Sequence, residues 1–147
     1  MKVSEVMTRN PTVVAPTQSI CDAARMMADC DAGVLPVGDN DRLVGMITDR
    51  DIAIRAVGEN RGPDTPVREV MSKEVLYCFD DEDVDHVARN MGEQQVRRLP
   101  VVNRDKRLVG IVSIGDVSRR ADADTTRSAM EGITQPSGSH NQSQALH

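Results

Sequence analysis

The chain has 147 residues and a mass of 16.1 kDa, which allows one domain or two very small ones. Its formal charge of −5 and its scarcity of aromatic residues, Tyr77 and Phe79 alone, disfavour nucleic-acid binding, because phosphate attraction and base stacking both lack a source. Apolar stretches are far shorter than the ~20 residues of a membrane span, and residues 1–5 lack the apolar core of a signal peptide. The odd number of cysteines, three, fits reduced thiols better than a disulfide framework. We therefore expect a cytoplasmic protein without membrane contact.

The first predicted element is a β-branched strand at residues 12–15, and a helix follows it. Two short strands at 34–37 and 43–48 flank a polar turn, and a last helix runs from near residue 48 to about 57. The first helix shows one buried stripe with the spacing i, i+3, i+4 and i+7, formed by Ile20, Ala23, Ala24 and Met27.

The same order of elements returns in the second half of the chain. A strand at 75–79 precedes a helix, strands follow at 99–102 and 108–113, and a final helix reaches about Ala121. The helical stripe is repeated position for position by Val84, Val87, Ala88 and Met91.

Identical residues show that the two halves are an internal repeat. Residues 5–56 and 69–121 share 16 identical pairs, and a one-residue slip falls in the polar turn between the two short strands. The longest matches are Glu-Val-Met at 5–7 and 69–71, Leu-Pro-Val at 35–37 and 99–101, and Arg-Leu-Val-Gly at 42–45 and 107–110.

The repeat predicts an α/β (α+β) fold made of two β-α-β-β-α units. One such unit buries too little surface to be secure alone, so we expect the two to pack as a pseudo-twofold pair. The domains are predicted at residues 1–60 and 67–121, joined by a turn-forming linker at 61–66. A polar tail occupies 122–147, in which a short helix can form at 125–133 and the remainder is predicted to be disordered.

Each repeat carries a hydroxyl-x-x-acid motif where its last strand gives way to its last helix. The residues are Thr48 with Asp51, and Ser113 with Asp116. The simpler interpretation is a helix cap, in which the hydroxyl accepts from a backbone N–H and the acid suits the helix dipole. The same geometry also suits a nucleotide, because helix N–H groups attract phosphate and an acid accepts from two ribose hydroxyls. The residues alone leave both interpretations open.

Other site chemistry is weakly represented. Cys21 and Cys30 are nine residues apart on one helix, which places them on opposite sides, and Cys78 lies in a predicted buried strand. The chain has no His-x-x-x-His spacing and no Ser-His-Asp set. We therefore predict no metal ligands and no catalytic residues.

The motifs together resemble the cystathionine-β-synthase (CBS) domain family. The first repeat shows Val-Met-Thr, Leu-Pro-Val and Leu-Val-Gly-Met-Ile-Thr-Asp-Arg-Asp, and the second shows Val-Met-Ser, Leu-Pro-Val-Val and Leu-Val-Gly-Ile-Val-Ser-Ile-Gly-Asp. The resemblance covers about residues 3–121 and is to stand-alone bacterial CBS-pair proteins of the hypoxic response type. Inosine monophosphate dehydrogenase carries an inserted CBS pair, but the resemblance does not imply its activity.

The resemblance implies two ligand sites, with the hydroxyl on phosphate and the acid on ribose. Thr48 and Asp51 would serve one site, and Ser113 and Asp116 the other. The residues implied near the base are Thr12, Val13 and Pro36 for the first site, and Leu76 and Pro100 for the second.

Basic residues are implied at the ligand phosphates. Arg97 and Arg98 would reach the ligand held by Asp51, and Arg50 would reach the ligand held by Asp116. The alternative for the arginine pair is a solvated strand end.

The function that we predict is a regulatory sensor of an adenine nucleotide or related ligand, such as AMP, ADP, ATP, NAD or S-adenosylmethionine, with no required cofactor. The alternatives are a ligand-free structural or stress protein with an unidentified protein partner and, with less support, a purine-linked enzyme. The apolar segment 52–57 spreads around more than one helix face, which predicts a homodimer.

Overall fold

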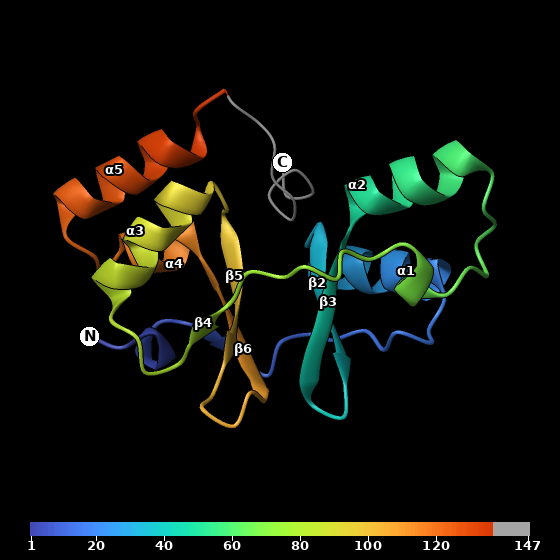
Figure 1. Ribbon diagram of the computed structural model, residues 1–147, viewed down its shortest axis with the longest axis horizontal. Coiled ribbons are helices and arrows are strands. Elements are labelled where there is room, and N and C mark those ends of the chain that lie inside the picture. The colour runs from blue at the N-terminus through green and yellow to red at the C-terminus, as the bar shows by residue number, and fades with distance from the viewer. Residues whose placement is uncertain (137–147) are drawn as a thin grey trace. The chain divides into compact units, whose positions relative to one another are not determined.

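The computed structural model describes residues 1–136, which divide into two compact units (Figure 1). The first-repeat unit consists of residues 12–75. The second-repeat unit joins residues 1–11 to residues 76–136. Each repeat therefore receives its N-terminal segment from the other repeat, an exchange that the repeat pattern does not reveal.

The second-repeat unit contains a four-stranded sheet in the order β1-β6-β5-β4. Strand β4 is parallel to β5, and the other pairs are antiparallel. Its elements are a 3-10 turn η1 (Val3–Glu5), β1 (Thr8–Arg9), β4 (Cys78–Phe79), α3 (Val84–Gln94), β5 (Arg98–Val102), β6 (Leu108–Ser113), α4 (Ile114–Ser118) and α5 (Ala123–Ile133). The buried face of α3 packs into the core with side chains of β4, β5 and β6.

The first-repeat unit has the same plan in a shorter form. Strand β2 pairs antiparallel with β3, and single bridges Val14–Val37 and Met46–Ser72 supply the two outer positions. Its elements are α1 (Ile20–Cys30), β2 (Val34–Asp39), β3 (Arg42–Thr48), α2 (Asp49–Asp51), a π-helical turn η2 (Ile52–Ala56), and 3-10 turns η3 (Val57–Glu59) and η4 (Val67–Glu69).

In each unit, a methionine of the exchanged segment packs against a glycine of a strand. The backbone of Thr8 pairs with Ile111 in β6, and in the other unit Ser72 pairs with Met46 in β3. A Cβ on Gly110 would lie 2.5 Å from Met7 Sδ, and a Cβ on Gly45 would lie 2.6 Å from Met71 Sδ. The absence of a side chain thus permits the strand and the exchanged segment to approach closely.

The two helical stripes differ in one position. All four predicted residues of α3 are buried, whereas in α1 Ile20, Ala23 and Met27 are buried but Ala24 is exposed. The equivalent residue of α3, Ala88, is fully buried, and helix α5, which follows the second repeat alone, lies along α3 (Figure 1). A Cβ on Gly92 would lie 2.6 Å from the Cα of Ala129, so this helix pair packs backbone to backbone.

Several predicted bounds change. The strand predicted at 12–15 is one parallel bridge at Val14, and only Cys78–Phe79 of the stretch 75–79 is a strand. The helix predicted from residue 48 to 57 is interrupted by the π-helical turn, and α4 ends at Ser118 rather than at Ala121. Short-range patterns do not show the two strand bounds, because these depend on tertiary pairing.

The tail prediction is partly testable. A helix does form in the tail, as α5, two residues earlier than the predicted start. Most of the segment predicted to be disordered, residues 137–147, lies outside the described part of the chain. Among residues 1–136, no helix combines the length and the apolar character needed to cross a bilayer.

Substitution of Gly45 by alanine should destabilise the fold. The new Cβ would meet Met71 Sδ at 2.6 Å and the carbonyl oxygen of Ser72 at 2.8 Å, so a loss of about 1–3 kcal/mol is expected. Gly62→Ala is the matched control, because its Cβ would meet nothing within 4 Å. Urea unfolding followed by circular dichroism measures both variants, and equal stabilities would contradict the seating of Met71 on Gly45.

Candidate functional site

In the first-repeat unit, the motif residues form a reciprocal cap where β3 meets α2. The Thr48 hydroxyl accepts from the Asp51 N–H at 3.0 Å, and Asp51 Oδ2 accepts from the Thr48 N–H at 3.0 Å. Thr48 is fully buried and Asp51 is 7% exposed. The cap interpretation is therefore confirmed, and the contacts leave Asp51 Oδ1 without a hydrogen bond among the described residues.

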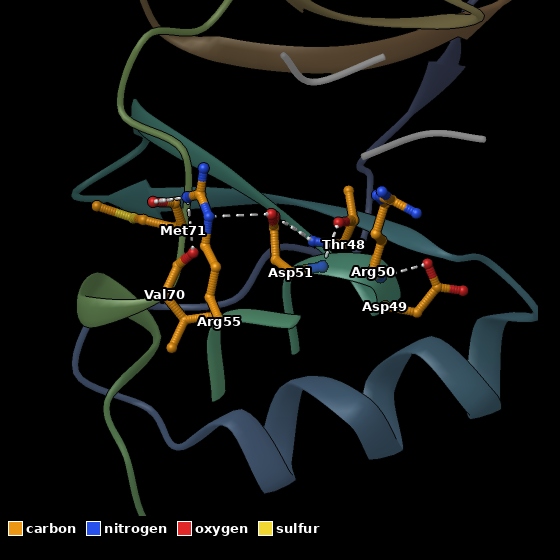
Figure 2. A network of polar contacts seen from close by, with 7 residues as sticks. All are labelled: Thr48, Asp49, Arg50, Asp51, Arg55, Val70 and Met71. Atoms are coloured by element: carbon orange, nitrogen blue, oxygen red, sulfur yellow. Dashed lines mark hydrogen bonds and ion pairs between the residues drawn. The ribbon is translucent and has the colours of Figure 1, made fainter. Parts of the chain in front are cut away.

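Burial is the main influence on the pKa of Asp51. Loss of solvent raises the pKa of this carboxyl above its ordinary value of 3.8, and the charge of Asp49 acts in the same direction. The hydrogen bonds to Thr48 and the charge of Arg55 oppose the rise. Arg55 Nε lies 3.9 Å from Asp51 Oδ1 (Figure 2).

The second-repeat unit builds the same cap where β6 meets α4. Ser113 Oγ accepts from the Asp116 N–H at 3.1 Å, and Asp116 Oδ2 accepts from the Ser113 N–H at 2.9 Å. Both residues are half-buried, so this acid is more accessible than Asp51. The two caps share their chemistry and differ in solvent access.

The residues predicted near the base lie beside the strands that carry the caps. Val14 donates to the Pro36 carbonyl at 3.1 Å, which places the backbone of Thr12 and Val13 next to β2. Val13 Cγ1 would lie 2.8 Å from a Cβ on Gly38, and Pro36 is buried. The structure thus brings the first-site residues Thr12, Val13, Pro36, Thr48 and Asp51 into one unit.

The second set is likewise in one unit. Leu76 is half-buried against the core of the second-repeat unit, and Pro100 is buried in β5 opposite Ile111 of β6. β6 ends at Ser113, the hydroxyl of the cap, two residues after Ile111.

The predicted arginines lie at the strand ends next to the caps. Arg98 is opposite Ser113 in the β5–β6 register, and the Arg97 carbonyl accepts from the Ile114 N–H at 2.8 Å. These arginines therefore belong to the unit of Asp116, and their predicted role toward Asp51 stays a prediction. Arg50 is exposed and extends on the opposite side of Asp51 from Arg55 (Figure 2). Its role toward Asp116 also stays a prediction.

The cysteines are dispersed. Cys78 is buried in β4, as predicted, and burial raises the pKa of its thiol to about 12. Cys21 is half-buried and Cys30 is exposed on α1. His86 is exposed on α3, and its Nε2 lies 3.3 Å from Oε1 of Glu82, which precedes the helix. Residues 1–136 contain no group of three or more metal-ligating side chains.

Two polar residues at the first cap were missed by the sequence analysis. Arg55 follows Asp51 by four residues, a helical ion-pair spacing that could have indicated it. Asp49 Oδ1 accepts from the Arg50 N–H at 2.8 Å and so occupies a donor at the start of α2. The contacts of Arg55 with a distant segment were not predictable, because they arise from tertiary folding.

A sequence model of the CBS domain matches this chain twice, at residues 3–58 and 67–122. The chain belongs to the CBS domain family. The matched ranges coincide with the two repeats and contain both caps, so the predicted resemblance is confirmed.

Two proteins with CBS-type sequences illustrate the relationship. The CBS domain-containing protein YhcV of Bacillus subtilis is 40% identical over 116 residues, which are 79% of this chain and 82% of that protein. Hypoxic response protein 1 of Mycobacterium tuberculosis is 37% identical over 117 residues, 78% of this chain and 81% of that protein.

Two solved CBS structures contain adenosyl ligands. The CBS domain pair of protein MJ0100, in complex with 5′-methylthioadenosine and S-adenosyl-L-methionine, is 34% identical with a TM-score of 0.70 and covers 81% of this chain and 94% of that one. CBSX2 of Arabidopsis thaliana, in complex with AMP, is 31% identical with a TM-score of 0.70 and covers 80% of this chain and 93% of that one.

The stability of the CBS pair should depend on pH in opposite ways through two acids. Because the pKa of Asp51 is raised in the folded state, its carboxylate destabilises the fold at neutral pH, and this penalty fades as pH falls through the raised pKa. The free energy of unfolding of the wild type, relative to Asp51→Asn, should therefore increase between pH 7 and pH 4 in urea titrations.

Asp81→Asn is the control of opposite sign. Hydrogen bonds from Arg104 at 2.7 and 2.9 Å lower the pKa of Asp81, so its stabilisation is present at neutral pH and is lost on acidification. A wild-type protein that loses stability relative to both variants as pH falls would contradict the raised pKa of Asp51.

Proposed function

We propose that this CBS pair is a regulatory module that binds an adenine nucleotide or a related adenosyl ligand. The observation that carries the proposal is the duplicated cap, in which a hydroxyl and an acid meet at the end of a strand in both repeats. The ligand-bound structures of MJ0100 and CBSX2 support the adenosyl class. AMP, ADP, ATP, NAD and S-adenosylmethionine remain the candidates.

The cap has the chemistry needed for a ribose and a phosphate. Each acid uses Oδ2 for the cap, so Oδ1 is the oxygen that would accept from ribose hydroxyls. The hydroxyl side chain and the neighbouring arginines would contact phosphate. Aliphatic side chains and backbone at residues 12–14 and 76 would hold the base, since aromatic side chains are nearly absent from the sequence.

The proposal makes the chain a binding module and not an enzyme. Asp51 and Asp116 are engaged in helix caps, and the buried thiol of Cys78 has a pKa of about 12, which disfavours a nucleophilic role for this cysteine. A regulatory ligand requires reversible binding alone, which two caps with arginines nearby would supply.

Replacement of either acid should weaken binding and leave the fold intact. Loss of hydrogen bonds to a charged carboxylate costs about 1.5–3 kcal/mol, so Asp51→Ala or Asp116→Ala should lower the affinity of one site about tenfold to a hundredfold. Isothermal titration calorimetry with AMP, ATP and S-adenosylmethionine measures the affinities. Because one capping contact is lost, the change in stability should stay within about 1 kcal/mol.

A thermal-shift series with the same ligands provides the control. A ligand at 100 times its dissociation constant stabilises the folded state by about 2.7 kcal/mol, and this gain should shrink in both acid variants. Wild-type protein that no ligand of the panel stabilises would overturn the nucleotide proposal and favour a ligand-free interaction protein.

We also propose that the protein is a homodimer. Ile54 is 51% exposed and Val57 is 68% exposed on the helical segment that follows α2, which agrees with an apolar face left open for a second copy. Sedimentation of the wild type should give about twice the chain mass, and Ile54→Glu/Val57→Glu should give a monomer. Met130→Glu, at a residue 43% exposed on α5, is the control that should remain dimeric. A monomeric wild type would contradict the proposal.

A further inference from the structure

Arg55 is held in a defined place beside the first acid. Its Nη1 donates to the carbonyl oxygens of Val70 at 3.2 Å and Met71 at 3.4 Å (Figure 2). These carbonyls follow η4, in which Val67 is fully buried, and Val70 is fully buried as well. The core therefore fixes the two acceptors, and they fix the direction of the guanidinium, although half of the Arg55 side chain is exposed.

The separation between Arg55 and Asp51 permits attraction without a hydrogen bond. Nε lies 3.9 Å from Asp51 Oδ1, within ion-pair distance but beyond hydrogen-bond range. Asp51 Oδ2 already accepts from Thr48. Arg55 thus favours the ionised carboxylate while Oδ1 keeps its lone pairs for another donor.

The second repeat has the same arginine but not the same arrangement. Arg120 is the counterpart of Arg55, four residues after Asp116. It is exposed, and among the described residues it makes no side-chain hydrogen bond or ion pair. The helical path differs as well, because α4 ends at Ser118 whereas the first repeat continues through the π-helical turn η2, which contains Arg55.

We propose that Arg55 is the positioning residue of the first-repeat site, where it keeps Asp51 ionised and leaves Oδ1 directed at a ligand hydroxyl. The part that concerns a ligand rests on the proposed function. The effect on Asp51 is a property of the unliganded chain. The two repeats would then differ, because Arg55 is held beside the buried acid of the first, whereas the acid of the second is more accessible to solvent.

The charged groups that act on Asp51 oppose one another. Burial and Asp49 favour the neutral acid, and Arg55 with the Thr48 hydrogen bonds favours the carboxylate. Protonation of Asp51 would place a proton on the carboxyl group whose Oδ1 must accept from a ligand hydroxyl. Ligand affinity should therefore fall as the acid becomes protonated.

The first test measures Asp51 in the unliganded protein. The carboxyl ¹³C resonance of Asp51 is titrated with pH in the wild type, Arg55→Gln, Arg55→Lys and Arg120→Gln. Arg55→Gln should raise the midpoint, because it removes the positive charge that favours the carboxylate. Arg55→Lys should restore part of the difference, and Arg120→Gln should match the wild type. An unchanged midpoint in Arg55→Gln would overturn the proposal.

The second test measures AMP affinity between pH 4.5 and 8 by calorimetry. The midpoint of the pH dependence at the Asp51 site, isolated in an Asp116→Ala background, should shift upward in Arg55→Gln by the same amount as the NMR midpoint. If the wild type binds no member of the ligand panel, the proposed function fails while the NMR titration still decides the role of Arg55. If the wild type binds and Arg55→Gln has an unchanged pH dependence, the positioning role fails alone.

Discussion

The reciprocal cap between a hydroxyl and an acid determines how each repeat joins its sheet to its last helix. A strand that ends in an uncapped helix leaves backbone N–H groups without partners, and here the side chains of residues three apart satisfy two of them at once. The two hydrogen bonds of the cap hold the carboxylate in one orientation, with Oδ2 occupied and Oδ1 available. Under the proposed function, the oxygen that the cap leaves free would accept from ribose hydroxyls.

The exchanged N-terminal segments give the repeat its second constraint. Gly45 and Gly110 allow the methionines of the Glu-Val-Met motifs to approach strand backbone closely. A larger residue would separate the segment from the strand and remove an outer position of the sheet. The glycine and the methionine are distant in sequence, yet they act as one packing unit in each half of the molecule.

Differences between the repeats begin outside the shared motifs. Helix α5 covers α3 through Gly92 and Ala129, so the second repeat buries a helix face that the first leaves exposed at Ala24. In the first repeat, the π-helical turn and the carbonyls of Val70 and Met71 place Arg55 against Asp51. Identical residues therefore acquire different surroundings, as the contrast between Arg55 and Arg120 shows.

The sequence by itself determined the duplicated α/β plan, the two capped acids and the two helical stripes except at Ala24, because these depend on short-range periodicity and on motif spacing. It did not determine which repeat each N-terminal segment joins, since the Glu-Val-Met motif is identical in both repeats and does not distinguish the two sheets. Tertiary structure decided that exchange, the short single-bridge strands and the burial of Asp51. It also decided the role of Arg55, because carbonyl groups 15 and 16 residues away along the chain orient its guanidinium.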